Sequence, residues 1–149
     1  MRAERGFTLV ELLVVFAIIA LLMAVVPVAF DRLRESTQYR DTIRGMLSDM
    51  RQARYRALAE GREVRFRVDL DERSYGVEGR TAKAVPQPLK LRATVAGAQL
   101  TGTQVAGIVF LPSGGATGGT IEIVRPSGAG VRLRVDWLSG GVAQIPIQQ

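Results

Sequence analysis

The sequence predicts an α+β protein in which a long N-terminal helix, apolar in its first half and amphipathic in its second, packs on antiparallel β-sheets. Residues 12–30 contain no charged side chain. From residue 31 to about residue 60, apolar side chains recur at steps of three and four residues, which is the period of one helix face. After residue 63, apolar and polar side chains alternate, as in strands with one buried face.

The apolar run has the length of a membrane span. As a helix, its 19 residues would extend about 28 Å, close to the ~30 Å of a bilayer core. A secretory signal peptide would end in a small-residue cleavage site, which residues 24–26, Ala-Val-Val, do not offer. Pro27 removes one backbone donor, so we expect the helix to kink there. The pattern therefore predicts a transmembrane helix over residues 7–30.

One carboxylate, that of Glu11, lies close to the N-terminal end of this apolar segment. A charged side chain within a spanning helix costs on the order of 3 kcal/mol, so such a residue usually has a functional role and a partner. Arg2 and Arg5 precede the segment, and the positive-inside rule then places the N-terminus in the cytoplasm. The bulk of the chain is expected outside the inner membrane.

The residues around this carboxylate resemble a known processing signal. The string Arg5-Gly6-Phe7-Thr8-Leu9-Val10-Glu11 is similar to the class III signal of type IV pilins and type II secretion pseudopilins. The resemblance implies that prepilin peptidase cuts between Gly6 and Phe7, that Phe7 is N-methylated, and that Glu11 pairs with the N-terminal amine of a neighbouring subunit during assembly. The chain then divides into a leader (1–6), a transmembrane and filament-core helix (7–30) and a periplasmic helix plus β-sheet domain (31–149).

Turn residues and periodicity predict the remaining elements. Gly61 offers a helix stop, and residues 71–73 predict a hairpin turn between the first two strands. Trp137 is expected on the same strand face as Val131, Leu133 and Val135. The predicted strands cover residues 63–70, 74–78, 89–95, 107–111, 120–124, 131–138 and 142–145, with a connection at residues 96–106.

Composition excludes several kinds of chemistry. The 149 residues include no cysteine and no histidine, so the chain lacks disulfides, a thiolate nucleophile, the commonest general base and the commonest metal ligand. We therefore expect no enzymatic activity, no cofactor and no bound metal. The formal net charge of +6 raises the question of a nucleic-acid partner.

Two motifs have both a functional and a plain structural interpretation. The stretch Gly114–Gly119 offers clustered backbone N–H groups for a phosphate, but it lacks the lysine and hydroxyl ending of a P-loop. A hairpin connection is the preferred interpretation. Asp69, Asp71 and Glu72 offer oxygen ligands for calcium, but their spacing lacks the glycine and the final glutamate of an EF-hand. A turn is preferred there.

Arginines on the expected strands raise the alternative of DNA binding. Cations such as these contact phosphates, but alternating arginines are also ordinary on a solvated sheet face. Nucleic acid is therefore not expected as the main partner. A FimT-like minor type IV pilin that binds DNA during natural transformation stays as the alternative function, and a membrane-anchored periplasmic adaptor as a third. The arginines concerned are Arg65, Arg67, Arg132 and Arg134.

Later segments narrow the resemblance to the GspH/FimT family. They include residues 110–114 (Phe-Leu-Pro-Ser-Gly), Gly118–Ile121 and a Ser-Gly-Gly-Val turn at residues 139–142. DNA-binding FimT-like members tend to carry a basic Gly-Arg-x-Arg segment near the C-terminus, whereas residues 139–145 contain no basic residue. The resemblance implies a helix packed on two β-sheets and a minor pseudopilin of GspH type, at or near the tip of the periplasmic pseudopilus of the type II secretion system, where it aids export of folded proteins.

The same resemblance implies the partners and the location. The partners are other major and minor pseudopilins in a tip complex, prepilin peptidase, the inner-membrane assembly platform and secreted cargo. The protein is expected to cross the inner membrane once, with its globular domain in the periplasm. Because loops carry most recognition, contacts are expected at residues 79–88 and 112–119.

Overall fold

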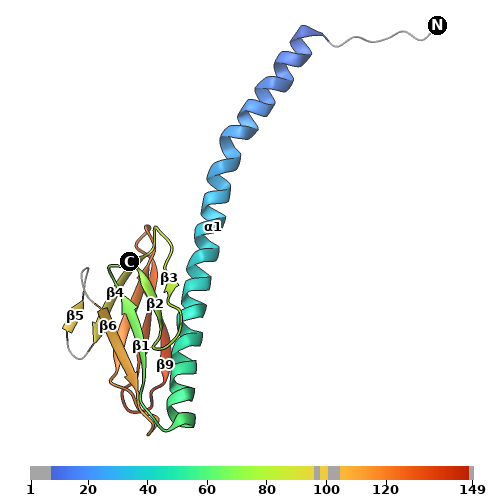
Figure 1. Cartoon of the computed structure of the whole chain (residues 1–149). Helices are drawn as coiled ribbons and strands as arrows, with labels where there is room; N and C mark the ends of the chain where they lie inside the picture. The colour runs from blue at the N-terminus through green and yellow to red at the C-terminus, as the bar shows by residue number, and fades with distance from the viewer. Residues whose placement is uncertain (1–7, 96–97, 101–104, 148–149) are drawn as a thin grey trace. The chain divides into compact units, whose positions relative to one another are not determined.

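The computed structural model describes residues 8–95, 98–100 and 105–147, without the side chains of residues 24–33 and 98–100. The expected processing residues Gly6 and Phe7 lie outside this range. Within it, one helix is followed by nine strands (Figure 1). The chain forms two compact units, Met1–Thr37 and Gln38–Gln149, and each is considered by itself.

A single helix, α1 (Leu9–Glu60), accounts for the whole N-terminal part of the described chain. It ends where the sequence predicts, because Gly61 adopts a left-handed conformation with φ of 63° that favours glycine after a helix. The helix continues through Pro27, and the kink expected at this residue stays a prediction. In the described part of the chain, no helix is long and apolar enough to cross a membrane.

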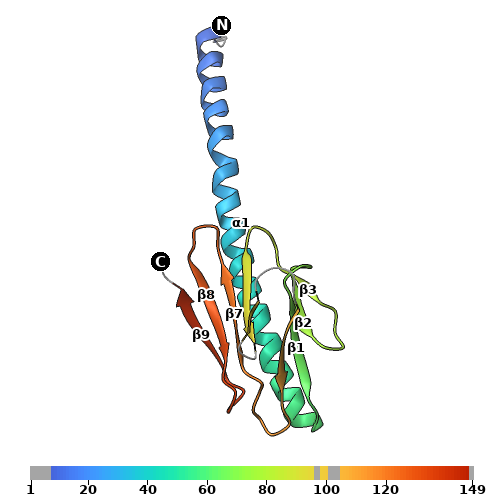
Figure 2. The same ribbon diagram turned by 90° about the vertical axis from the view of Figure 1, so that its left-hand side faces the viewer.

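Two antiparallel sheets follow the helix (Figure 2). The four-stranded sheet has the order β3-β2-β1-β6, and the five-stranded sheet has the order β5-β4-β7-β8-β9. The strands are β1 (Val64–Asp69), β2 (Ser74–Val77), β3 (Lys83–Ala84), β4 (Lys90–Val95), β5 (Ala98–Leu100), β6 (Val105–Phe110), β7 (Gly119–Val124), β8 (Gly130–Val135) and β9 (Val142–Ile147).

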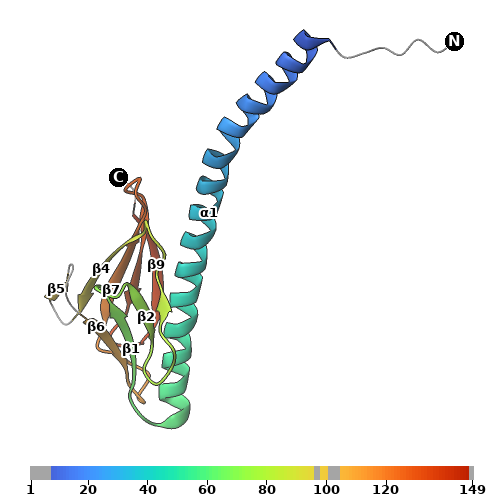
Figure 3. The same cartoon turned by 45° about the horizontal axis from the view of Figure 1, so that its top comes forward.

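The core of the globular unit lies between the C-terminal half of α1 and the inner faces of both sheets (Figure 3). The strand alternation predicted from the sequence holds for β1, where Val64, Phe66 and Val68 are buried and the arginines between them are exposed. Apolar residues of α1 at helical spacing cover this face, as expected for an amphipathic helix. They are Tyr39, Ile43, Met46, Met50, Ala53 and Ala57.

Three details differ from the sequence-based prediction. The segment 96–106, expected as a connection, contains β5 and the start of β6. The segment 79–88, expected as a loop, contains the two-residue strand β3. The strand expected over 131–138 ends at Val135. Trp137, expected on the strand face of Val131, Leu133 and Val135, is 68% exposed, whereas those three residues are buried. The strand stops because the Asp136 carboxylate accepts hydrogen bonds from the amides of Leu138 and Ser139 and folds the chain into a turn.

Candidate functional site

The N-terminal end of α1 is a capped helix end. The hydroxyl of Thr8 accepts a hydrogen bond from the amide of Glu11 at 3.2 Å, and the carbonyl of Thr8 accepts one from the amide of Leu12 at 3.2 Å. Thr8 is therefore the N-cap residue, and Glu11 occupies the third helical position, the arrangement of a Ser/Thr-x-x-Glu capping box. Glu11 is thus held on the first turn of the helix, where the helix dipole favours an anion.

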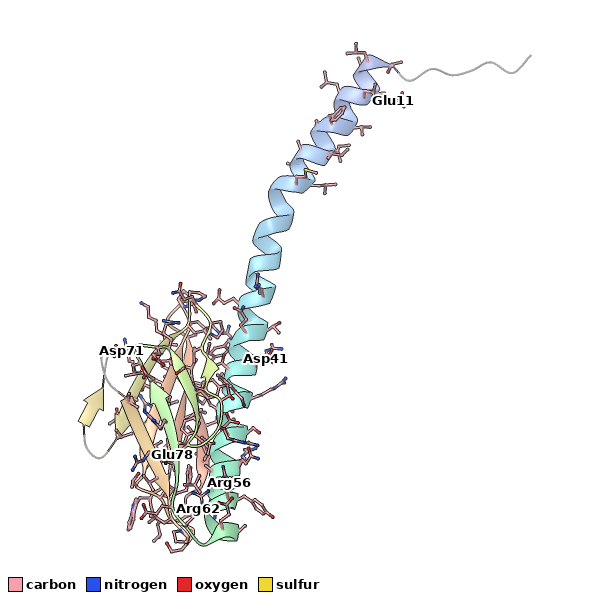
Figure 4. All side chains as sticks on the ribbon, in the orientation of Figure 1. Glu11, Asp41, Arg56, Arg62, Asp71 and Glu78 are labelled. Carbon is pink, nitrogen blue, oxygen red and sulfur yellow. The ribbon has the colours of Figure 1, made fainter. Side chains whose placement is uncertain are left out.

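The first turns of α1 carry a single charge among exposed apolar side chains. Glu11 is exposed and is the only acid in the first turn (Figure 4). Twelve large hydrophobic side chains between Leu9 and Met23 are 42–79% exposed. An exposed apolar surface of this extent marks a site that a membrane or another protein covers.

The segment 79–88 is fixed to the helix. The ammonium of Lys83 lies 2.8 Å and 2.9 Å from the two carboxylate oxygens of Asp49 on α1. Arg80 donates a hydrogen bond to the side chain of Gln52, one turn further along the helix. Val85 is buried in the core. Much of this expected contact loop therefore serves to close the four-stranded sheet against α1.

Tyr75 completes the contact between β2 and the helix. Its side chain is 5% exposed, and a Cβ atom at Gly45 on α1 would overlap its hydroxyl group. Burial raises the pKa of the Tyr75 phenol, and the nearby Asp49 carboxylate raises this pKa further. The ammonium of Lys83 lies 5.9 Å from the Tyr75 ring centre. The missing side chain of Gly45 is thus what lets Tyr75 approach α1.

The glycine-rich stretch 114–119 packs against the turn at residues 136–141. The amide of Ala116 donates a hydrogen bond of 2.9 Å to the carbonyl of Trp137. A Cβ atom at Gly115 would lie only 2.9 Å from the same carbonyl oxygen, and one at Gly118 only 3.2 Å from the Trp137 Cβ. These glycines are therefore required for close approach of two backbones. The hairpin connection expected from the sequence is wrong, because the strands that the stretch joins, β6 and β7, belong to different sheets.

The acidic turn at residues 69–72 is also structural. One carboxylate oxygen of Asp69 accepts hydrogen bonds from the amides of Asp71 at 3.0 Å and Glu72 at 2.8 Å. This is an Asx-type cap of the β1–β2 hairpin. Among the residues that the structure describes, no group of three or more acidic side chains could hold a metal ion.

The arginines considered for DNA binding belong to two sheets. Arg65 and Arg67 lie on β1, whereas Arg132 and Arg134 lie on β8 of the other sheet. Arg132 forms an ion pair of 2.7 Å with Glu122 on the neighbouring strand β7, at the register position directly opposite. That pairing leaves less positive charge for phosphate than the sequence suggests.

Sequence reasoning missed several of these residues. Thr8 had a local signal, because Thr8 and Glu11 have the spacing of a capping box. The contacts of Asp49 with Lys83 and of Gly45 with Tyr75 have no such signal, since their partners are 34 and 30 residues apart in the sequence.

A long N-terminal helix whose residues from Gln38 onward pack on two antiparallel sheets, with one acid at the start of an apolar run, defines a type IV pilin-like subunit. Two solved structures of the minor pseudopilin EpsH from the type II secretion system of Vibrio cholerae share the fold, with TM-scores of 0.57 and 0.60 at 14% sequence identity. The similarity covers 73% and 76% of this chain and 97% of each of those chains.

Sequence comparisons specify the family. Residues 42–141 match the family model described as Type II transport protein GspH, and residues 1–27 match the prokaryotic N-terminal methylation motif. The chain is 29% identical over 147 residues to the type II secretion system protein H of Xanthomonas campestris pv. campestris, covering 99% of this chain and 86% of that protein. The chain belongs to the GspH family, and its function is that of a minor pseudopilin of the type II secretion system.

Proposed function

We propose that the protein is a subunit at or near the tip of a periplasmic pseudopilus, and that it aids the export of folded proteins across the outer membrane by a mechanical role without catalysis. In this proposal, prepilin peptidase cuts between Gly6 and Phe7, and Phe7 is N-methylated. Residues 7–30 hold the subunit in the inner membrane and later form part of the filament core, while residues 31–149 lie in the periplasm.

The position of Glu11 carries this proposal. It is the one charged residue between Leu9 and Phe30, and the Thr8 cap fixes the helix turn on which it lies. An unpaired carboxylate surrounded by apolar side chains is costly in a membrane or a filament core. A cation that reaches it there restores much of that free energy, because charges attract strongly in a low dielectric. The N-terminal amine of a neighbouring subunit would supply such a cation.

The exposed apolar side chains of α1 support the same proposal. The described residues from Leu9 to Met23 offer no apolar cover of their own. Lipid in the inner membrane would cover them before assembly, and helices of neighbouring subunits would cover them afterwards. The assembly platform and the other pseudopilins are the partners that this exchange requires.

A secretion assay tests the proposal. In a strain that lacks this gene, proteins normally found in the medium should accumulate in the periplasm, and the full-length chain should restore their export. Glu11→Ala should fail to restore it, whereas Asp41→Ala, which removes another exposed acid of α1 (Figure 4), should restore it. Normal secretion without the gene, or full rescue by Glu11→Ala, would contradict the proposal.

A further inference from the structure

Four large apolar side chains are exposed together at the end of the globular unit where α1 ends. Of the six large hydrophobic residues that are exposed in the described part of residues 38–147, these four belong to α1 and to the turn at residues 136–141. We call this set the end patch. Its members and their exposed fractions are Tyr55 (71%), Leu58 (47%), Trp137 (68%) and Leu138 (71%).

The end patch combines two elements that both lie beside the glycine-rich stretch. Tyr55 and Leu58 are three residues apart on α1 and so lie on neighbouring positions of one helix face. The side chain of Leu58 lies beside the glycine-rich stretch, since a Cβ atom added at Gly114 would be 3.6 Å from it. The adjacent Gly115 lies directly against the backbone of Trp137 and Leu138.

The turn that carries Trp137 and Leu138 is rigidly built. The Asp136 carboxylate accepts hydrogen bonds from the Leu138 amide and from both the amide and the hydroxyl of Ser139. These bonds, led by those from Ser139, lower the pKa of Asp136 and keep it ionised. The backbone of Asp136 is also bonded to Gly140 and Gly141 at 2.9 Å. An anchor that is already ordered loses little entropy when a partner binds it.

Positive charge borders the patch. Arg134 and Trp137 line the same depression, which has a volume of about 330 Å³. None of the ion pairs among the described residues includes Arg134. The Asp136 carboxylate lines the same depression, and, after the hydrogen bonds from Ser139, the charge of Arg134 contributes to lowering the pKa of Asp136. At the α1 side, Arg54 lies beside the glycine-rich stretch, with its Nε 3.4 Å from the Gly114 carbonyl. Trp, Tyr and Arg are the residues enriched in the energetic centres of protein interfaces.

We propose that the end patch is the docking surface for a different pseudopilin subunit, which offers an apolar surface with a carboxylate at its border. This inference rests on the proposed function, in which α1 packs along the filament. A surface at the C-terminal end of α1 then faces the next subunit along that direction. The apolar centre buries Trp137 and Leu138, and the partner's carboxylate meets Arg134.

Photo-crosslinking in secreting cells tests this surface in the full-length chain. p-Benzoylphenylalanine replaces Trp137 in one protein and Ile145 in a control, since Ile145 is an exposed aliphatic residue on β9 outside the patch. We expect adducts with another pseudopilin at position 137, identified by mass spectrometry, in a yield at least about tenfold above position 145. Equal yields would overturn the proposal, as would adducts made only with lipid, a secreted protein or a second copy of this chain.

Matched charge variants give a second test. Leu138→Asp should lower export of secreted proteins about tenfold or more, whereas Ile145→Asp, which adds the same charge opposite Arg132, should leave export within about twofold. The amount and protease resistance of each protein are measured in the same cells. Unchanged export in the Leu138→Asp strain would overturn the proposal that the end patch is a docking surface. The proposed function has separate criteria, because it fails if loss of the whole gene leaves secretion normal or if Glu11→Ala fully restores secretion.

Discussion

The ammonium of Lys83 lies 2.8 Å and 2.9 Å from the two carboxylate oxygens of Asp49. The carboxylate is on the buried face of α1, with its side chain 10% exposed, whereas the Lys83 side chain is 52% exposed. The two partners are therefore unequal. Without its partner, the ammonium can turn to water, but the carboxylate cannot. This pair joins the four-stranded sheet to the helix.

We expect Lys83→Met to destabilise the globular unit by about 2 kcal/mol, because it leaves the buried Asp49 carboxylate unpaired. Asp49→Asn should cost only about 1 kcal/mol, since the remaining Lys83 is hydrated. The free energies of unfolding are measured by urea denaturation. The double variant should be more stable than the sum of the two losses predicts, by about 1 kcal/mol. Strict additivity would show that the contact contributes nothing to stability.

Gly45→Ala should destabilise the protein although alanine is the better helix former. Alanine gains about 1 kcal/mol in helix propensity, but its Cβ would overlap the buried hydroxyl of Tyr75, and overpacking of this kind costs about 1–3 kcal/mol. Tyr75→Phe in the same chain removes the overlapping oxygen. The double variant Gly45→Ala/Tyr75→Phe should therefore be more stable than Gly45→Ala alone in thermal unfolding. A Gly45→Ala protein more stable than wild type would contradict this account.

The periodicity of apolar residues in the sequence predicted the helix and strands correctly where one face of the element packs on the core. The exposed Arg65 and Arg67 between buried residues of β1, and the helix face from Ile43 to Ala57, follow directly from spacing. The same rule failed at Trp137. Alternation continues in the sequence through residues 136–138, but the Asp136 carboxylate competes for the amides that a strand would use, as short acidic side chains often do.

The candidate site was predictable only where its signal is local. Glu11 is conspicuous because the residues around it are apolar, and Gly61 because it follows a helical pattern. For Gly45, within a helix, the sequence indicates only a residue of low helix propensity. Its role depends on Tyr75, which the fold brings from a strand 30 residues later. The end patch likewise combines residues 55–58 with residues 137–138, which no periodicity connects.

The stability of the protein should fall in alkali partly through Tyr75. Burial and the Asp49 carboxylate raise the pKa of this phenol above its usual value of 10.0. The unfolded chain therefore releases the proton first, so this contribution is full below about pH 10 and is lost as pH rises through the folded-state pKa. Between pH 9 and pH 11, wild type should lose more unfolding free energy than Tyr75→Phe, in which every other titrating group is retained. Equal losses would exclude this role for Tyr75.

The Thr8 cap should control the order of the first turn of α1. The valine in Thr8→Val has nearly the same shape as threonine but lacks the hydroxyl that accepts the hydrogen bond from the Glu11 amide. Loss of an N-cap lowers helix stability by about 1 kcal/mol. Amide hydrogen exchange of the full-length chain in detergent micelles should therefore become about fivefold faster at residues 10–11. Thr8→Ser keeps the hydroxyl and should exchange like wild type. If Thr8→Val and Thr8→Ser exchange alike, the hydroxyl does not hold this turn, and Glu11 must be positioned by its neighbours in the filament instead.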